Sequence, residues 1–208
     1  MGSPSLILTA LSLLLCCSSA VAAEGVLFSS LKPTLSITAS FKKGQALVAG
    51  EDTITVSWSL NQTLAGNTDA SYKTVKVKLC YAPVSQTDRG WRKTKDNLGK
   101  DKTCQFTITT GPYPAKAPKS GGPFTWTVER DIPTATYFVR AYAFDASGKE
   151  VAYGQTTDTE KSTNLFEVKG ISGRHASIDI AAACFSAFSV VSLTGFFVAE
   201  KRRRTSSK

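Results

Sequence analysis

Residues 180–199 form an uncharged stretch that is followed at once by the acidic residue Glu200 and the basic run 201–204. Twenty residues of α-helix rise about 30 Å, the thickness of the hydrocarbon core of a bilayer. The sequence therefore predicts a transmembrane helix over 176–199 and a basic tail over 200–208, which the excess of Lys and Arg places in the cytoplasm. A glycolipid-anchor signal is the competing interpretation, but such a signal ends in its apolar tail, without a basic stop.

The first 23 residues are also uncharged. Their apolar core, 6–17, is too short to span a bilayer, and small residues follow it at 18–23. These features predict a secretory signal peptide cleaved near Ala22 or Ala23, although its first five residues lack Lys and Arg. An uncleaved membrane anchor is the less favoured alternative. Residues 24–172 then remain as one extracellular domain, large enough for its own core.

The cysteines separate by compartment. Cys16 and Cys17 lie in the predicted signal peptide and Cys184 lies in the predicted span, which leaves Cys80 and Cys104 in the extracellular domain. Because exported domains meet oxidising conditions, we expect these two to form a disulfide; two free thiols are the alternative.

The single N-glycosylation sequon is Asn61-Gln62-Thr63. It follows a predicted strand and opens a polar loop, where an acceptor is accessible. We therefore expect a glycan on Asn61.

Period-two alternation of apolar and polar residues runs through the extracellular domain and is clearest over 53–60. Similar patterns predict strands over 35–41, 75–81, 106–108, 124–128, 137–144, 150–153 and 164–168. The segment 137–144 is apolar on both faces except at Arg140, which is typical of a central strand. Seven or eight short strands predict an all-β fold, an antiparallel sandwich like immunoglobulin or fibronectin-III domains, followed by one C-terminal transmembrane helix. Cys80 falls on the face opposite Val77 and Leu79, so its disulfide should hold the ends of a loop and not join the two sheets.

That loop, 83–102, contains no convincing strand. Long loops in compact domains are usually functional or disordered, and the expected disulfide argues against disorder. Trp91 among several Arg and Lys residues has the composition of an interface anchor. Alternatively, Trp91 packs on the sandwich and the charges only keep the loop soluble. The candidate partner-binding residues are Arg89, Trp91, Arg92, Lys93, Asp96, Asp101 and Lys102.

The predicted transmembrane helix carries small residues at spacings of three and four, which let helices approach closely. Asp179, at its outer edge, suits either the positive end of the helix dipole or a polar contact with another membrane helix. The phenylalanines at 185, 188, 196 and 197 are expected to face lipid. The candidate helix-contact residues are Asp179, Ala182, Ser186, Ser189, Ser192 and Gly195.

The residue inventory argues against an enzyme. The chain has one histidine, His175, placed at the entry to the predicted span, and it shows no catalytic or metal-ligating constellation and no cofactor motif. The net charge of +9 does not indicate a nucleic-acid-binding protein, because the folded domain is predicted to lie outside the cell. A tail too short for a signalling domain leaves two interpretations: an obligate accessory subunit of another membrane protein, or a ligand-binding co-receptor.

Several longer motifs are similar to those of one family, the plant high-affinity nitrate transporter-activating proteins. They cover most of the mature chain and lie at residues 75–83, 91–94, 100–104, 125–134, 136–143, 171–177 and 184–189. The resemblance implies a non-catalytic accessory subunit without cofactors. It also implies a partner, a multi-span nitrate transporter of the major-facilitator type, in a membrane-embedded hetero-oligomer at the plasma membrane. In that setting we expect the loop to contact the outer face of the transporter, with Arg92 and Asp101 as charge partners.

Overall fold

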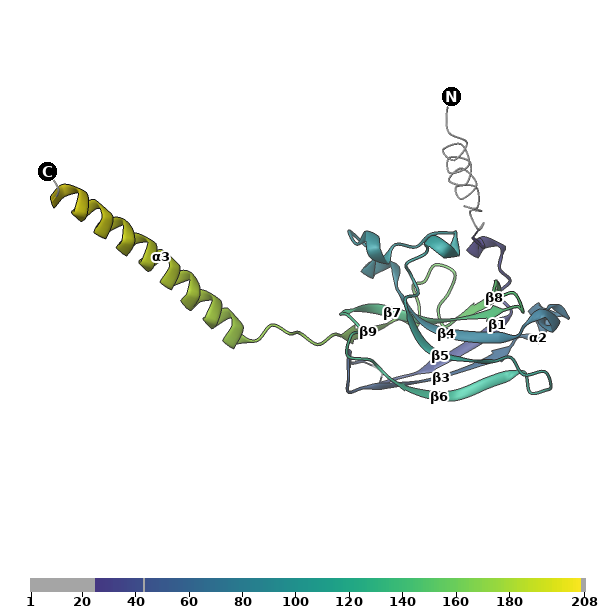
Figure 1. The fold of residues 1–208 in the computed structure, drawn as a ribbon. Coiled ribbons are helices and arrows are strands. Elements are labelled where there is room, and N and C mark those ends of the chain that lie inside the picture. Colours follow the sequence, from purple (N-terminus) through teal and green to yellow (C-terminus); the bar gives the residue numbers. More distant parts are fainter. Residues whose placement is uncertain (1–24, 43, 207–208) are drawn as a thin grey trace, which may run out of the picture.

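The structure is a computed structural model that describes residues 25–42 and 44–206, so the predicted signal peptide lies outside the described residues. It consists of two packed β-sheets and one long helix (Figure 1). The small sheet has the order β1-β3-β6. In the large sheet the order is β2-β9-β7-β4-β5, and β8 also pairs with β7. The strands are β1 (Leu35–Ser40), β2 (Leu47–Val48), β3 (Thr53–Leu60), β4 (Thr74–Tyr81), β5 (Phe106–Pro112), β6 (Ser120–Thr127), β7 (Ala135–Phe144), β8 (Glu150–Gln155) and β9 (Phe166–Lys169).

The predicted immunoglobulin-like sandwich is confirmed, with differences at its edges. Strand β3 has the predicted bounds, whereas β2 was not predicted because two residues show no period. Strand β2 also pairs parallel with β9, whereas the other pairs of described strands are antiparallel. Strand β6 begins before its apolar pattern does, and Gly121 pairs there with Trp58. A Cβ at Gly121 would lie 2.5 Å from the indole nitrogen of Trp58, so only glycine lets the ring lie against this strand.

The main core lies between the two sheets. Alternate residues of β3, among them Ile54 and Val56, face alternate residues of β4, among them Val77 and Leu79, and all four are fully buried. Burying such side chains stabilises the fold by about 1.5–3 kcal/mol each. The period-two pattern of the sequence therefore identifies the inner faces correctly.

Strand β7 is buried on both faces because a second layer covers the outside of the large sheet. Its inner face carries Val139 and Ala141 into the main core, while Phe138, Arg140 and Tyr142 point outward. The outer residues are covered by the N-terminal segment, residues 25–34, and by the loop between β4 and β5. Together with its pairing to β4, β8 and β9, this covering accounts for the predicted central strand.

Arg140 lies at the centre of the outer layer with 1 % of its surface exposed. Its Nε and Nη2 donate to Gln155 Oε1 (3.2 and 2.9 Å) and its Nη1 donates to the Tyr142 hydroxyl (3.1 Å). The guanidinium carbon lies 4.3 Å from the ring centre of Phe28. The buried charge is thus held by neutral acceptors and aromatic faces, which tie the N-terminal segment to the sheet.

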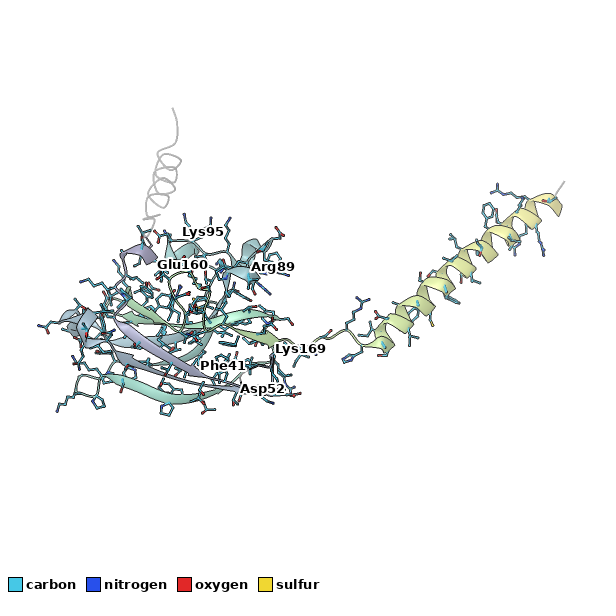
Figure 2. All side chains as sticks on the ribbon, turned by 180° about the vertical axis from the view of Figure 1, so that it is seen from behind. Phe41, Asp52, Arg89, Lys95, Glu160 and Lys169 are labelled. Carbon is cyan, nitrogen blue, oxygen red and sulfur yellow. A yellow bond between two sulfur atoms is a disulfide. The ribbon has the colours of Figure 1, made fainter. Side chains whose placement is uncertain are left out.

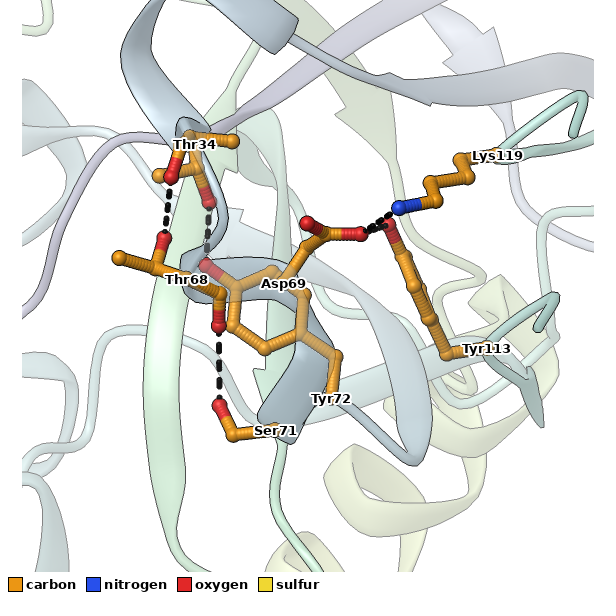
Figure 3. A network of polar contacts seen from close by, with 8 residues as sticks. Thr34, Thr68, Asp69, Ser71, Tyr72, Tyr113 and Lys119 are labelled. Carbon is orange, nitrogen blue, oxygen red and sulfur yellow. Dashed lines mark hydrogen bonds and ion pairs between the residues drawn. The ribbon is translucent and has the colours of Figure 1, made fainter. Parts of the chain in front are cut away.

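At the far end of the sandwich a polar network fixes the connection between β3 and β4 (Figure 3). This connection contains α2 (Gln62–Ala65) and the 3₁₀-helix η2 (Thr68–Ser71). Asp69, 5 % exposed, forms an ion pair with Lys119 and accepts a hydrogen bond from the Tyr113 hydroxyl (3.0 Å). The Lys119 ammonium lowers the pKa of Asp69, while burial, together with the Asp69 carboxylate, raises the pKa of Tyr113.

Helix α3 (Ala176–Ser206) follows the six-residue connection 170–175 and is exposed along its whole length. Among the described residues it is the one helix long and apolar enough to cross a membrane. The helix does not end at Ala199 but continues through the basic run, where Arg204 Nε lies 3.1 Å from Glu200 Oε1. No Gly or Pro interrupts residues 196–206, so the predicted basic tail extends the same helix.

Replacing Asp69 with Asn should lower the free energy of unfolding by about 1–3 kcal/mol at pH 7, because Lys119 and Tyr113 lose a charged acceptor. Since folding lowers the Asp69 pKa, the stability that the carboxylate contributes is present above its unfolded pKa of about 3.9 and is lost as the pH falls through the folded pKa. Urea unfolding at several pH values should therefore show the gap between the two proteins closing in acid. The exposed carboxylate of Asp88, replaced with Asn, is the control. A gap that stays constant down to pH 2 would show that the Asp69 charge is not what stabilises this end.

Candidate functional site

The Cys80–Cys104 disulfide is present, with an S–S distance of 2.05 Å. Cys80 packs with Ala82 and Phe138 on the outer face of the large sheet, away from the main core. The bond therefore fastens the loop between β4 and β5 to the outside of the sheet, as expected, and does not join the two sheets. Residues 83–104 are called the disulfide loop below.

The disulfide loop is ordered without strands. It contains three short 3₁₀-helices, η3 (Pro83–Ser85), η4 (Gly90–Arg92) and η5 (Leu98–Lys100). Gln86 crosses the loop: its Nε2 donates to Tyr81 O (3.0 Å), and its Oε1 accepts from the backbone nitrogen and the hydroxyl of Thr94 (3.0 and 2.9 Å). The buried Thr103 hydroxyl belongs to the same cluster: it lies 2.7 Å from both Thr94 Oγ1 and Asp101 Oδ1, and its one hydrogen can be donated to either. Side-chain bonds to loop backbone thus replace the ladder bonds that a strand would supply.

Two of the predicted partner-binding carboxylates already bind within the domain. The carboxylate of Asp96 accepts from the nitrogen and the hydroxyl of Ser29 (2.8 and 2.9 Å), which joins the N-terminal segment to the loop. Asp101 Oδ1 accepts from Lys95 N and Thr103 N (3.0 and 3.2 Å). These two acidic residues therefore help to shape the loop, and their contact with a partner stays a prediction.

Arg92 is buried, with 7 % of its surface exposed, although we expected it to lie on the surface and bind a partner, as Trp91 was expected to do. A 3₁₀-helix has three residues per turn, so neighbouring side chains of η4 point in directions about 120° apart. The guanidinium carbon lies 4.4 Å from the ring centre of Tyr81, and Nη1 donates to Ser85 O at 3.4 Å. Among the described residues Nε has no partner and the side chain forms no ion pair, with Asp101 or with any other acid.

The remaining candidates of the loop are exposed. Trp91 has 63 % of its surface exposed, so the alternative that it packs on the sandwich is wrong. Its backbone is nonetheless fixed, because Gln105 Nε2 donates to Trp91 O (2.7 Å). Val84, a residue that the sequence did not single out, is 65 % exposed. We call the exposed set the loop surface: Val84, Arg89, Trp91, Lys93 and Lys102.

A cavity of about 400 Å³ lies between the disulfide loop and the edge of the large sheet. Arg89 and Lys169, both of which line it, lie at the end of the sandwich from which α3 departs (Figure 2). No sequence motif pointed to this cavity, because its walls come from four separate segments. They are Ala46, Val84, Ser85, Arg89, Arg92, 134–136 and 167–169.

In residues 25–42 and 44–206 no group of three or more His, Cys, Asp or Glu side chains is arranged to hold a metal ion.

Asn61 is the N-cap of α2, where its Oδ1 accepts from Thr63 N and Leu64 N (3.2 and 3.4 Å). Its Nδ2, the atom to which a glycan would be attached, donates no hydrogen bond within the described part of the chain. Glycosylation of Asn61 stays a prediction.

The predicted contact residues of α3 do not share one narrow face. Each residue of an α-helix turns by about 100°, so Gly195 lies roughly 140° from Ala182 and Phe185 falls between Ser189 and Ser192. The first four members do lie within about 80° of one another: Asp179, Ala182, Ser186 and Ser189.

Asp179 forms an ion pair that was not among the two roles predicted for it from the sequence. The Nε of Arg174, which precedes the helix, lies 3.1 Å from Asp179 Oδ1 and 3.3 Å from Oδ2. Both side chains are largely exposed, so this pair stabilises the helix by less than about 1 kcal/mol.

Comparison with known proteins finds relatives that match most of the chain. A family model described as "High-affinity nitrate transporter accessory, Ig-like domain" matches residues 28–173. The chain is 59 % identical over 160 residues to "High-affinity nitrate transporter 3.1" of Arabidopsis thaliana, which covers 77 % of this chain and 74 % of that protein. It is 54 % identical over 179 residues to "High-affinity nitrate transporter-activating protein 2.1" of Oryza sativa subsp. japonica, covering 86 % and 83 %.

Truncation of two neighbouring residues of η4, Trp91 and Arg92, should change the free energy of unfolding by different amounts. Trp91→Ala should change the free energy of unfolding by less than about 0.5 kcal/mol, because the ring is exposed. Arg92→Ala should lower it by about 1–3 kcal/mol, since the aliphatic stem and the stacking on Tyr81 are lost. Denaturant unfolding of both variants measures the difference. Equal losses would contradict the inward and outward placement of these side chains.

Proposed function

Because the chain belongs to the family of high-affinity nitrate transporter accessory proteins, we propose that it is a non-catalytic subunit that binds a multi-span nitrate transporter. Transport would be carried out by that partner, of the major-facilitator type, and the present chain would support its stability and delivery to the plasma membrane. The observation that carries the proposal is the likeness over most of the chain to a relative named a transporter-activating protein.

The architecture supports this role. The disulfide-bearing sandwich suits the outside of the cell, and α3 suits a single span with the basic run on the cytoplasmic side. The connection 170–175 spans at most about 20 Å, so a membrane-embedded α3 would keep the sandwich close to the membrane surface. A partner in the same membrane would then meet both the outer domain and the helix.

We assign the outer contact to the loop surface. An exposed Trp beside Arg and Lys on a fixed backbone is the composition of an interface hot spot, and rigidity reduces the entropy lost on binding. Arg92, Asp96 and Asp101 contribute by holding the loop in shape. The membrane contact is assigned to the shared face of Asp179, Ala182, Ser186 and Ser189.

Uptake of labelled nitrate tests the accessory role most simply. Cells would express this chain, a high-affinity nitrate transporter from the same organism, or both. We expect uptake well above background only with both, because the transport path and its activator lie on different chains. Full uptake by the transporter alone would contradict the proposal, and binding of another extracellular ligand without any effect on uptake would favour a co-receptor instead.

Trp91→Ala should reduce co-purification of the transporter at least about tenfold, as truncation of a hot-spot residue does. The matched control is Leu64→Ala, which truncates another exposed apolar residue, 56 % exposed and located at the far end of the sandwich. The control should co-purify like the unaltered protein. Equal behaviour of the two variants would remove the loop surface from the proposal and leave the accessory role to the uptake measurement.

A further inference from the structure

The cavity beside the disulfide loop contains an arginine whose charge is poorly compensated. Buried charged groups are normally paired, because removing them from water costs several kcal/mol. Among the described residues the guanidinium of Arg92 donates to Ser85 O through Nη1, at the long distance of 3.4 Å, and its Nε is buried without a partner. Arg92, with 7 % of its surface exposed and no carboxylate partner among the described residues, can therefore still accept the negative charge of a bound anion.

The remaining walls of the cavity favour an anion. Arg89 and Lys169 add two cations at the rim, and Glu167 is the one acid among the lining residues. None of these three side chains forms an ion pair in the described part of the structure. With Arg92 included, the cavity has three positive charges and one negative charge.

Hydroxyl groups supply neutral donors. Ser85 Oγ accepts from Thr136 N (2.7 Å) and Thr134 Oγ1 accepts from Gly170 N (2.9 Å), so each hydroxyl hydrogen is left to point elsewhere. The backbone bonds also fix where these oxygens lie. The cavity thus combines preset hydroxyl donors with a guanidinium, which is the donor set of an oxyanion site.

We propose that this cavity binds a small planar oxyanion, and that in the setting of the proposed function the anion is nitrate. The flat guanidinium of Arg92, stacked on Tyr81, can offer parallel N–H groups to two oxygens of a planar anion. Arg89 and Lys169 attract the anion and close the rim. About 400 Å³ accommodates such an ion together with several waters.

The position of the cavity gives the site a use. Two residues that line it, Arg89 and Lys169, lie at the end of the sandwich from which α3 departs (Figure 2), and this end would be near the membrane when α3 spans it. Nitrate held there would be concentrated next to the mouth of a transporter that this chain accompanies. The identity of the anion rests on the proposed function, but the existence of the site depends only on the residues that line the cavity.

The test is nitrate binding by the purified full chain in detergent, measured by titration calorimetry and by the rise in unfolding temperature at constant ionic strength. We expect saturable nitrate binding. Arg92→Gln should weaken it at least about tenfold, because a charge-assisted bond is lost. The double variant Arg89→Gln with Lys169→Gln alters only exposed rim residues, keeps the fold, and should weaken binding severalfold. Lys149→Gln, which removes one exposed positive charge from the β7–β8 turn, should bind like the unaltered protein.

Three results would overturn the site: no saturable nitrate binding, binding that chloride matches at equal concentration, or binding that neither the Arg92 variant nor the rim variant weakens. The measurement contains no transporter, so its failure leaves the accessory role standing, and failure of the uptake experiment leaves the anion site standing.

Discussion

Burial of the outer face of the large sheet is the constraint on which the candidate site depends. Strand β7 sends Phe138 and Arg140 outward, and these side chains would be exposed if the fold were a simple sandwich. The disulfide loop and the N-terminal segment cover them, and the Cys80–Cys104 bond fastens the loop in that position. The loop is therefore a second core layer on its inner side, and this packing holds in place the outer side, to which we assign the partner contact.

Because the inner side of the loop covers the sheet and its outer side is exposed, the side chains of the loop fall into two groups. Thr103, Arg92 and Gln86 point inward and hold the loop, whereas Trp91 and Arg89 point outward. A short 3₁₀-helix lets adjacent residues take opposite roles. A substitution in the loop can thus impair a partner contact in two ways, by removing a contacting side chain or by changing the shape of the loop, and measurements of stability separate the two.

Most of the fold could be predicted from the sequence, because period-two alternation over residues such as Ile54 and Val56 reports directly which face is buried. The disulfide could be predicted because the extracellular domain contains two cysteines and exported domains meet oxidising conditions. The inward position of Arg92 could not be predicted, since a three-residue 3₁₀-helix leaves no periodic signal. The cavity could not be predicted either, because the pairing of β7 with β9 brings Thr134 and Lys169 together, and Ser85 joins them only through the hydrogen bond that its Oγ accepts from Thr136 N. Strand β2 could not be predicted for a similar reason, because its two residues have no periodic pattern and form a strand only by pairing with β9.

The central claim is that the loop surface, carried by the disulfide loop that covers the outer face of the large sheet, meets a membrane partner. Hydrogen–deuterium exchange of the full chain, alone and in complex with a nitrate transporter, tests it most directly. The account predicts slower exchange on binding at the amides of residues 88–93, with no change around α2 and η2 at the far end. Unchanged exchange at residues 88–93 together with new protection elsewhere on the sandwich would contradict it.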